Sequence, residues 1–192
     1  MKYRIFSALL LVLSLFIAGC NNSASTPGAT TKALLSTEAI EAGAKGFTVG
    51  AAMSTRTVYV FFDAQCPHCS ALWYAAKPLK SQAKFVWIPV GILNGASTSQ
   101  GATILAASDP AAAMEVHEAS MMAKAGGISA TNDADAQKDA IRKNTEMMTA
   151  FGFASIPTIV AKHAQTGELV KQEGAMPTAA LASFLGLQVP AQ

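Results

Sequence analysis

The pattern of apolar and polar positions along the chain predicts alternating strands and helices. Residues 57–62 are apolar at almost every position, which is typical of a strand buried on both faces of a sheet. From Pro67 onward, apolar residues recur at three- and four-residue spacing, so a helix is predicted directly after that strand. The predicted strands are residues 47–49, 57–62, 84–90, 158–162 and 169–172, with further helices or turns at 38–45 and 178–185.

A long segment, residues 94–152, is rich in alanine and methionine and has helical periodicity. Breaks at Asp109-Pro110 and Gly126-Gly127 divide it into separate helices. Strands that alternate with helices and end in a hairpin and a closing helix predict an α/β fold, with helices on both sides of a small mixed sheet. Residues 94–152 then form a helical insertion in one domain, residues 37–192.

The N-terminal end of the chain has the pattern of an export signal over residues 1–19. An apolar run at residues 5–17 follows a short positively charged start and is too short to span a bilayer as a permanent helix. The letters IAGC resemble a bacterial lipobox, which implies a lipid on Cys20; a cleaved signal with an unmodified Cys20 is the alternative. Asn21 favours the outer membrane by resemblance to the sorting pattern, and residues 20–36 are small and polar, which predicts a flexible tether.

Length, charge and cysteine content narrow the possible functions. A chain of 192 residues suits one domain with its own core. The formal net charge of +2 gives no sign of a clustered basic surface, so nucleic acid is not an expected partner. Export leads to an oxidising compartment, where cysteine pairs form disulfides or are kept reduced for a purpose. If Cys20 is lipidated, the remaining thiols are Cys66 and Cys69.

The Cys-Pro-His-Cys unit that begins at Cys66 admits three interpretations. Structural zinc needs four ligands, whereas this chain has one cysteine pair, with His117 and His163 far away in the sequence. A structural disulfide stabilises chiefly by closing a long loop, and Cys66 and Cys69 would close one of the shortest rings possible. A reactive dithiol therefore fits best, and no metal or other cofactor is expected.

The start of a helix is a favourable place for a reactive sulfur. There the Cys66 sulfur lies near unpaired backbone N–H groups and the positive end of the helix dipole, which favour the thiolate. His68 adds a donor or a positive charge, and Pro67 fits the first helical turn without loss of a hydrogen bond. We therefore expect a lowered pKa and a nucleophilic role for Cys66, with Cys69 as the more buried resolving thiol.

The run VYVFFDAQCPHCSALWYAAKPLK is similar to the catalytic domain of the DsbC/DsbG family of bacterial periplasmic thiol-disulfide isomerases, above all to its DsbG-type members. The likeness continues through ATILAASDPAAAMEVHEAS and FGFASIPTIV and covers about residues 47–187. It implies a thioredoxin fold in which Pro157 is cis and packs beside the cysteines. It also implies that the backbone of Ile156 pairs with an extended substrate segment near Cys66.

Three departures from the family change what the resemblance implies. The stretch between Cys20 and the first predicted strand has no room for the N-terminal dimerisation domain, which indicates a monomer. Ile156 stands where family members usually have threonine, so the direction of the reaction is left open. Val60 stands six positions before Cys66, where thioredoxin has a buried acid, so proton transfer from Cys69 lacks that base.

The leading hypothesis is an exported thiol-disulfide oxidoreductase that exchanges disulfides with cysteines of other exported proteins. It would act on the periplasmic side of the envelope, held by its lipid, and be reset by a membrane redox partner. Oxidation, isomerisation and reduction remain open as its direction. The alternative is a lipoprotein that carries copper(I) on Cys66, Cys69 and the methionines of the insertion. His117, flanked by Glu115 and Glu118, is expected on a solvated helix face.

Overall fold

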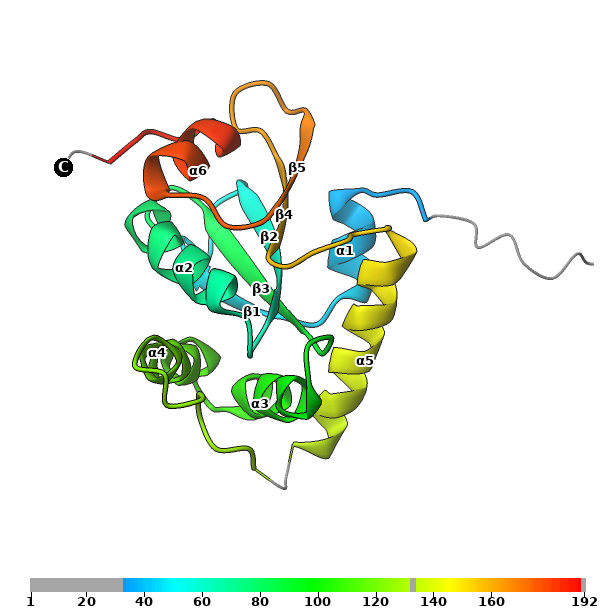
Figure 1. Ribbon diagram of the computed structural model, residues 1–192. Helices are drawn as coiled ribbons and strands as arrows, with labels where there is room; N and C mark the ends of the chain where they lie inside the picture. Colours follow the sequence, from blue (N-terminus) through cyan, green and yellow to red (C-terminus); the bar gives the residue numbers. More distant parts are fainter. Residues whose placement is uncertain (1–32, 132–133, 191–192) are drawn as a thin grey trace, which may run out of the picture. The chain divides into compact units, whose positions relative to one another are not determined.

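The computed structural model describes residues 33–131 and 134–190 (Figure 1). The predicted signal, residues 1–19, and the predicted lipidation site Cys20 lie outside these residues, as does most of the predicted tether. Within the described ranges, every helix is too short or too polar to cross a lipid bilayer.

Five strands form one mixed sheet in the order β1-β3-β2-β4-β5. The central strands β2 and β3 run parallel, with Thr57 opposite Lys84 and Asp63 opposite Val90, and the other neighbouring strands are antiparallel. All five strands predicted from the sequence are present, and each predicted end lies within one residue of the end in the structure. The strands are β1 Phe47–Gly50, β2 Thr57–Asp63, β3 Lys84–Val90, β4 Thr158–Lys162 and β5 Leu169–Glu173.

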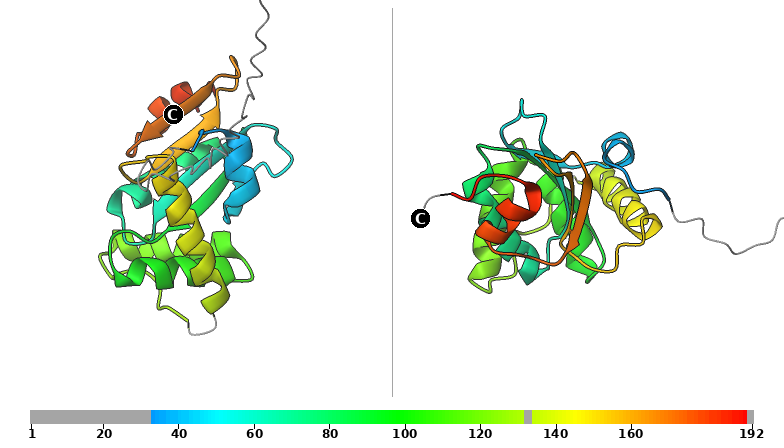
Figure 2. Two further views of the ribbon diagram at one scale, coloured as in Figure 1. Left: turned by 90° about the vertical axis from the view of Figure 1, so that its right-hand side faces the viewer. Right: turned by 90° about the horizontal axis from the view of Figure 1, so that it is seen from above.

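Helices cover both faces of this sheet, as Figure 2 shows. Along β2, Val58, Val60 and Phe62 pack into one core, whereas Tyr59 and Phe61 pack into the other, because successive side chains of a strand point to opposite faces. The first core lies under α2, α4 and α6, and the second lies under α1 and α5. The α-helices are α1 Thr37–Gly43, α2 Pro67–Ala76, α3 Gly95–Ala106, α4 Pro110–Met122, α5 Asp135–Ala150 and α6 Thr178–Leu185. This is the predicted α/β thioredoxin fold.

Local sequence explains where the helices begin and end. Asn94 caps α3, and its side chain accepts a hydrogen bond from the backbone N–H of Ala96. Asp109 caps α4 in the same way and is followed by Pro110 at the first helical position. The α-helical part of α2 ends at Ala76, and a 3-10 turn, Lys77–Leu79, contains the proline that cannot continue it.

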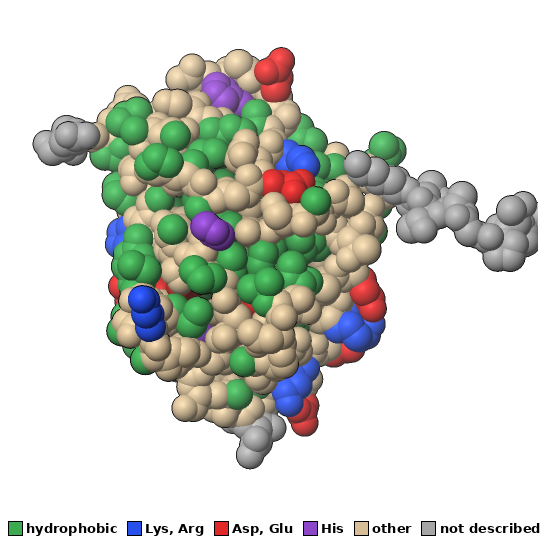
Figure 3. Space-filling view, in the orientation of Figure 1, with side chains coloured by type: hydrophobic (Ala, Val, Ile, Leu, Met, Phe, Trp, Pro, Cys, Tyr) green, Lys and Arg blue, Asp and Glu red, His purple; other side chains and the backbone are tan. Residues whose placement is uncertain are grey.

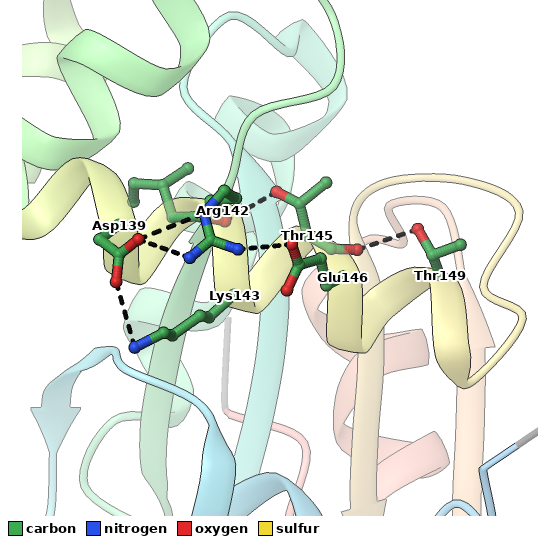
Figure 4. Close-up of polar contacts among 7 residues, drawn as sticks. Asp139, Arg142, Lys143, Thr145, Glu146 and Thr149 are labelled. Atoms are coloured by element: carbon green, nitrogen blue, oxygen red, sulfur yellow. Dashed lines mark hydrogen bonds and ion pairs between the residues drawn. The ribbon is translucent and has the colours of Figure 1, made fainter.

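The two sides of α5 differ in what they contribute to the fold. Its outer side carries ion pairs that join Asp139 to Arg142 and Lys143, and Arg142 to Glu146 (Figure 4). These side chains are more than half exposed, so water and salt weaken the pairs. On the inner side, the buried Asn144 donates to the backbone carbonyls of Lys45 and Pro89 at 2.7 and 2.9 Å. Asn144 therefore ties α5 to the sheet.

Candidate functional site

The turn from β2 into α2 is held by the carboxylate of Asp63, the last residue of the strand. Asp63 is fully buried and accepts hydrogen bonds from the backbone N–H groups of Gln65, Ile92 and Leu93, at 2.9, 2.8 and 3.1 Å. Its own carbonyl accepts from the N–H of Cys66 at 3.0 Å. Asp63 thus joins the turn to the loop after β3, and fixes the point at which α2 begins.

Cys66 is the N-cap residue of α2, and both cysteines are thiols in the structure. The pKa of the Cys66 thiol is lowered from 9.0 to about 6, chiefly by a hydrogen bond from the Cys69 thiol. The backbone N–H groups of Cys69 and His68 and the charge of His68 lower this pKa further, and burial opposes them. Pro67 and His68 are exposed at the first turn of the helix. The lowered pKa expected from the sequence is therefore present.

Cys69 lies deeper than Cys66 and has the opposite character. It has no exposed surface, and burial raises the pKa of its thiol well above 9.0. The hydrogen bond to Cys66 and the negative charges of Cys66 and Glu118 raise this pKa further. At neutral pH the pair is therefore a thiolate at Cys66 beside a protonated thiol at Cys69.

The loop before β4 supplies the remaining residues of the site. The Ile156–Pro157 peptide bond is cis, the geometry that the family resemblance implied. Pro157 is buried, and the carbonyl oxygen of the half-buried Ile156 lies 3.9 Å from the Cys66 sulfur. The fold therefore brings Ile156 and Pro157 to the cysteines across 90 residues of sequence.

His117 is buried, so the prediction of a solvated helix face was wrong. Its side chain has no exposed surface, and its Nε2 lies 2.6 Å from the carbonyl oxygen of Ala64 in the β2–α2 turn. Its Nδ1 accepts from the backbone N–H of Ile128 at 3.2 Å, so Nε2 carries the proton and donates to Ala64. Burial lowers the pKa of His117, which favours this neutral form. His117 joins the insertion to the turn before Cys66.

Glu118 is also buried, with 1 % of its surface exposed, which corrects the same prediction. Its Oε2 accepts a hydrogen bond from the hydroxyl of Ser70, the residue after Cys69. Glu115, by contrast, is about half exposed and binds Trp73 Nε1 at 2.9 Å. The sequence interpretation missed Glu118, although its spacing from the buried Met114 on the same helix face was a usable signal.

A pair of glutamines forms a further contact between the insertion and the turn. Gln65 Nε2 donates to Gln100 Oε1 at 2.5 Å and to the carbonyl of Gly126 at 3.2 Å. Gln100 in turn donates to the carbonyls of Gly126 and Ile128 at 2.8 and 2.9 Å. Sequence reasoning did not find these residues, because glutamines at this separation carry no recognisable motif.

The methionines considered for copper binding do not share one core with the cysteines. Met114 packs in the same core as Cys66 and Cys69, whereas Met148 packs on the opposite side of the sheet. No group of three or more His, Cys, Asp or Glu side chains is arranged to hold a metal ion in the part of the chain that is described.

The surface in Figure 3 is apolar near the middle of the face shown, and charged side chains lie mainly toward its edges.

The fold and this site together define a thioredoxin-fold protein with a dithiol centre. Solved structures agree on the fold. The catalytic domain of Proteus mirabilis ScsC aligns with a TM-score of 0.56 and 17% identity over 73% of this chain and 87% of that one. DsbA2 of Pseudomonas aeruginosa aligns with a TM-score of 0.59 and 20% identity over 72% of this chain and 91% of that one.

Sequence comparison adds a particular relationship, because the chain is a homologue of DsbG proteins. It is 34% identical over 143 residues to the thiol:disulfide interchange protein DsbG of Pseudomonas aeruginosa, covering 71% of this chain and 54% of that protein. It is 38% identical over 65 residues to DsbG of Escherichia coli K12, covering 33% of this chain and 26% of that protein. The chain therefore spans about half the length of the Pseudomonas relative. No protein-family model matches the chain.

The lowered pKa of Cys66 predicts a thiolate that forms as the pH rises through about 6. At pH 7 about nine-tenths of the Cys66 thiol should be ionised, and its rate of alkylation should level off above that pH. Cys69→Ala should move the midpoint upward, because it removes the strongest stabilising hydrogen bond. Ultraviolet absorbance of the thiolate measures both midpoints, with Cys66→Ser as the control that abolishes the transition. A wild-type midpoint near 9 would contradict this account of the site.

Two adjacent glycines offer a matched test of how His117 holds the loop. Gly126 and Gly127 have φ values of 87° and 88°, so alanine is strained at both, by about 1 to 2 kcal/mol. A methyl group at Gly127 would also overlap the His117 imidazole, whereas one at Gly126 meets nothing within 4 Å. Gly127→Ala should therefore lower the free energy of unfolding by about 1 to 3 kcal/mol more than Gly126→Ala, as measured by urea denaturation. Equal losses of unfolding free energy in the two variants would contradict this prediction, because they would show that the His117 imidazole moves aside without cost.

Proposed function

We propose that this protein is an exported thiol-disulfide oxidoreductase that exchanges disulfides with cysteines of other exported proteins. The observation that carries the proposal is the state of Cys66, a thiolate with a pKa of about 6 at the N-terminus of α2. The homology to DsbG of Pseudomonas aeruginosa, a thiol:disulfide interchange protein, supports the same activity. Cys66, Cys69, Pro67, His68 and Pro157 form the proposed catalytic centre.

In the proposed reaction, the Cys66 thiolate attacks one sulfur of a substrate disulfide and forms a mixed disulfide, while the substrate S–S bond breaks and the other substrate sulfur leaves as a thiolate. The low pKa favours this step, because the thiolate is the attacking species. The backbone of Ile156, beside the Cys66 sulfur, pairs with the substrate segment that carries the attacked sulfur. Cys69 then attacks the Cys66 sulfur, closes the intramolecular disulfide and releases the substrate thiol. The pair itself carries the electrons, and the proposal needs no other cofactor.

The proposed location is the periplasmic side of a bacterial envelope, with a lipid on Cys20 after removal of residues 1–19. The signal-like N-terminus supports export. A periplasmic thioredoxin-like protein from Salmonella enterica serovar Typhimurium has the same fold, with a TM-score of 0.57 and 19% identity over 73% of this chain and 88% of that one. On this proposal the tethered protein is a monomer, and a membrane redox partner resets its cysteine pair.

Substitution of the two cysteines tests the proposed order of attack. Cys69→Ala should accumulate mixed disulfides with exported proteins, because the trapped Cys66 adduct has no resolving thiol. Cys66→Ala should accumulate essentially none, because the buried thiol of Cys69 has a raised pKa and no access to substrate. Diagonal non-reducing electrophoresis of the full chain, expressed in a bacterial host, measures both. Equal trapping by the two variants would contradict the assignment of Cys66 as nucleophile.

The reduction potential of the pair should lie between those of DsbA and thioredoxin, about −120 and −270 mV. The pKa of Cys66, about 6, falls between about 3.5 for the DsbA thiol and about 7 for that of thioredoxin, and a more stable thiolate gives a more oxidising disulfide. Equilibration with glutathione buffers measures the potential. Stoichiometric copper(I) binding, with no acceleration of insulin reduction, would instead favour the metal-carrier alternative.

A further inference from the structure

Glu118 is a buried carboxyl group that the exchange reaction, as described so far, does not use. Its side chain is 1 % exposed and lies where α4 packs against α2. The hydroxyl of Ser70 donates to its Oε2, and no Lys or Arg in residues 33–131 or 134–190 forms an ion pair with it. A buried carboxylate without a cation is costly, so a protein that keeps one beside its reactive centre has a use for a proton acceptor there.

Cys69 is the group nearby that needs such an acceptor. To attack the Cys66 sulfur of a mixed disulfide, Cys69 must become a thiolate, yet it is fully buried. Thioredoxin-like proteins can place an acid on the strand before the first cysteine, but Val60 occupies that position here and packs into the core. Glu118 reaches the same buried region from the insertion: its charge raises the pKa of Cys69, and the charge of Cys66 raises the pKa of Glu118.

We propose that Glu118 accepts the proton of Cys69 in the step that releases substrate, and that Ser70 is the positioning residue that holds its carboxylate. The Ser70 hydroxyl belongs to the residue after Cys69, so the contact ties the carboxylate to the same turn of α2 as the resolving thiol. This inference rests on the proposed function and assigns the acid-base group of that same site.

The step balances without any further reactant. The Cys69 proton passes to the Glu118 carboxylate, and the Cys69 sulfur attacks the Cys66 sulfur. The Cys66–Cys69 bond forms as the bond between Cys66 and the substrate sulfur breaks, and the substrate leaves as a thiolate. The two cysteines are oxidised and the substrate disulfide, counted over both steps, is reduced. Glu118 then loses its proton to solvent; in the reverse direction it returns a proton to Cys69.

The charge of Cys66 determines when Glu118 can accept a proton. Burial raises the pKa of Glu118 to about 7, the Ser70 hydrogen bond opposes this, and the charges of Cys66 and Glu115 add to it. In the mixed disulfide Cys66 carries no charge, so the pKa of Glu118 falls and its carboxylate ionises when Cys69 must lose a proton. The charges of Cys66 and Glu115 act on Glu118, and Glu118 in turn acts on Cys69. The neighbouring His117 is hydrogen-bonded to Ala64 and Ile128.

The test is a two-step reaction of the reduced full chain with glutathione disulfide, followed by rapid acid quenching and mass spectrometry. Glu118→Gln should form the Cys66–glutathione adduct within about twofold of the wild-type rate. It should resolve that adduct about a hundredfold more slowly at pH 7, which is the low end of what general base catalysis contributes. The two resolution rates should converge as the pH rises, because hydroxide then removes the Cys69 proton in both proteins.

Two more variants separate proton transfer from a merely structural effect. Glu115→Gln, on the same helix but about half exposed, should resolve the adduct within about twofold of the wild-type rate at pH 7, with the rise of the rate moved slightly to lower pH, because the charge of Glu115 raises the pKa of Glu118. Ser70→Ala should move the rise of the resolution rate to higher pH, because its hydroxyl lowers the pKa of Glu118. A Glu118→Gln rate and pH profile equal to those of wild type would overturn the inference alone. If wild-type protein forms no Cys66–glutathione adduct, the proposed function fails and the inference fails with it.

Discussion

The turn between β2 and α2 has only three residues, and the chemistry of the site depends on how rigidly that turn is held. The Cys66 sulfur gains from the helix start only if it stays beside the first N–H groups of α2. Asp63 anchors one side of the turn to the loop after β3, and His117 anchors the other side to the insertion. Both anchors are buried, so water does not compete for their hydrogen bonds.

The helical insertion therefore contributes residues that hold and surround the site. Three of its polar side chains reach the region of the cysteines: Gln100 through Gln65, His117 through Ala64 and Glu118 through Ser70. Burying these groups costs free energy that a purely apolar helix face would not. In compensation, each makes a hydrogen bond to the segment that runs from the end of β2 into α2. The insertion thus helps to hold the turn before Cys66, and the charge of Glu118 contributes to the raised pKa of Cys69.

Much of this arrangement could be predicted from the sequence, for identifiable physical reasons. The buried strand at residues 57–62 is apolar throughout, and the cysteines follow it at a helix start, so local pattern was sufficient to predict both. Ile156 could be placed beside Cys66 only through family resemblance, because nothing local links positions 90 residues apart. His117 and Glu118 were misjudged because polar residues on a helix are usually solvated. Their spacing from Met114 marked an inward face, but only the folded structure supplies their buried partners, Ala64 and Ile128 for His117 and Ser70 for Glu118.

A single contact sets the two thiols apart and also creates the difficulty that the second step must overcome. The hydrogen bond from Cys69 is the largest contribution to the low pKa of Cys66, and it exists only while Cys69 keeps its proton. The first attack is therefore favoured by the same proton that blocks the second. Once Cys66 is bonded to substrate, its negative charge is gone and the hydrogen bond has lost its acceptor. The pKa of Cys69 then falls, because the hydrogen bond and the charge of Cys66 that raised it are both gone. On our proposal, the neighbouring carboxylate of Glu118 ionises at the same moment and takes the Cys69 proton.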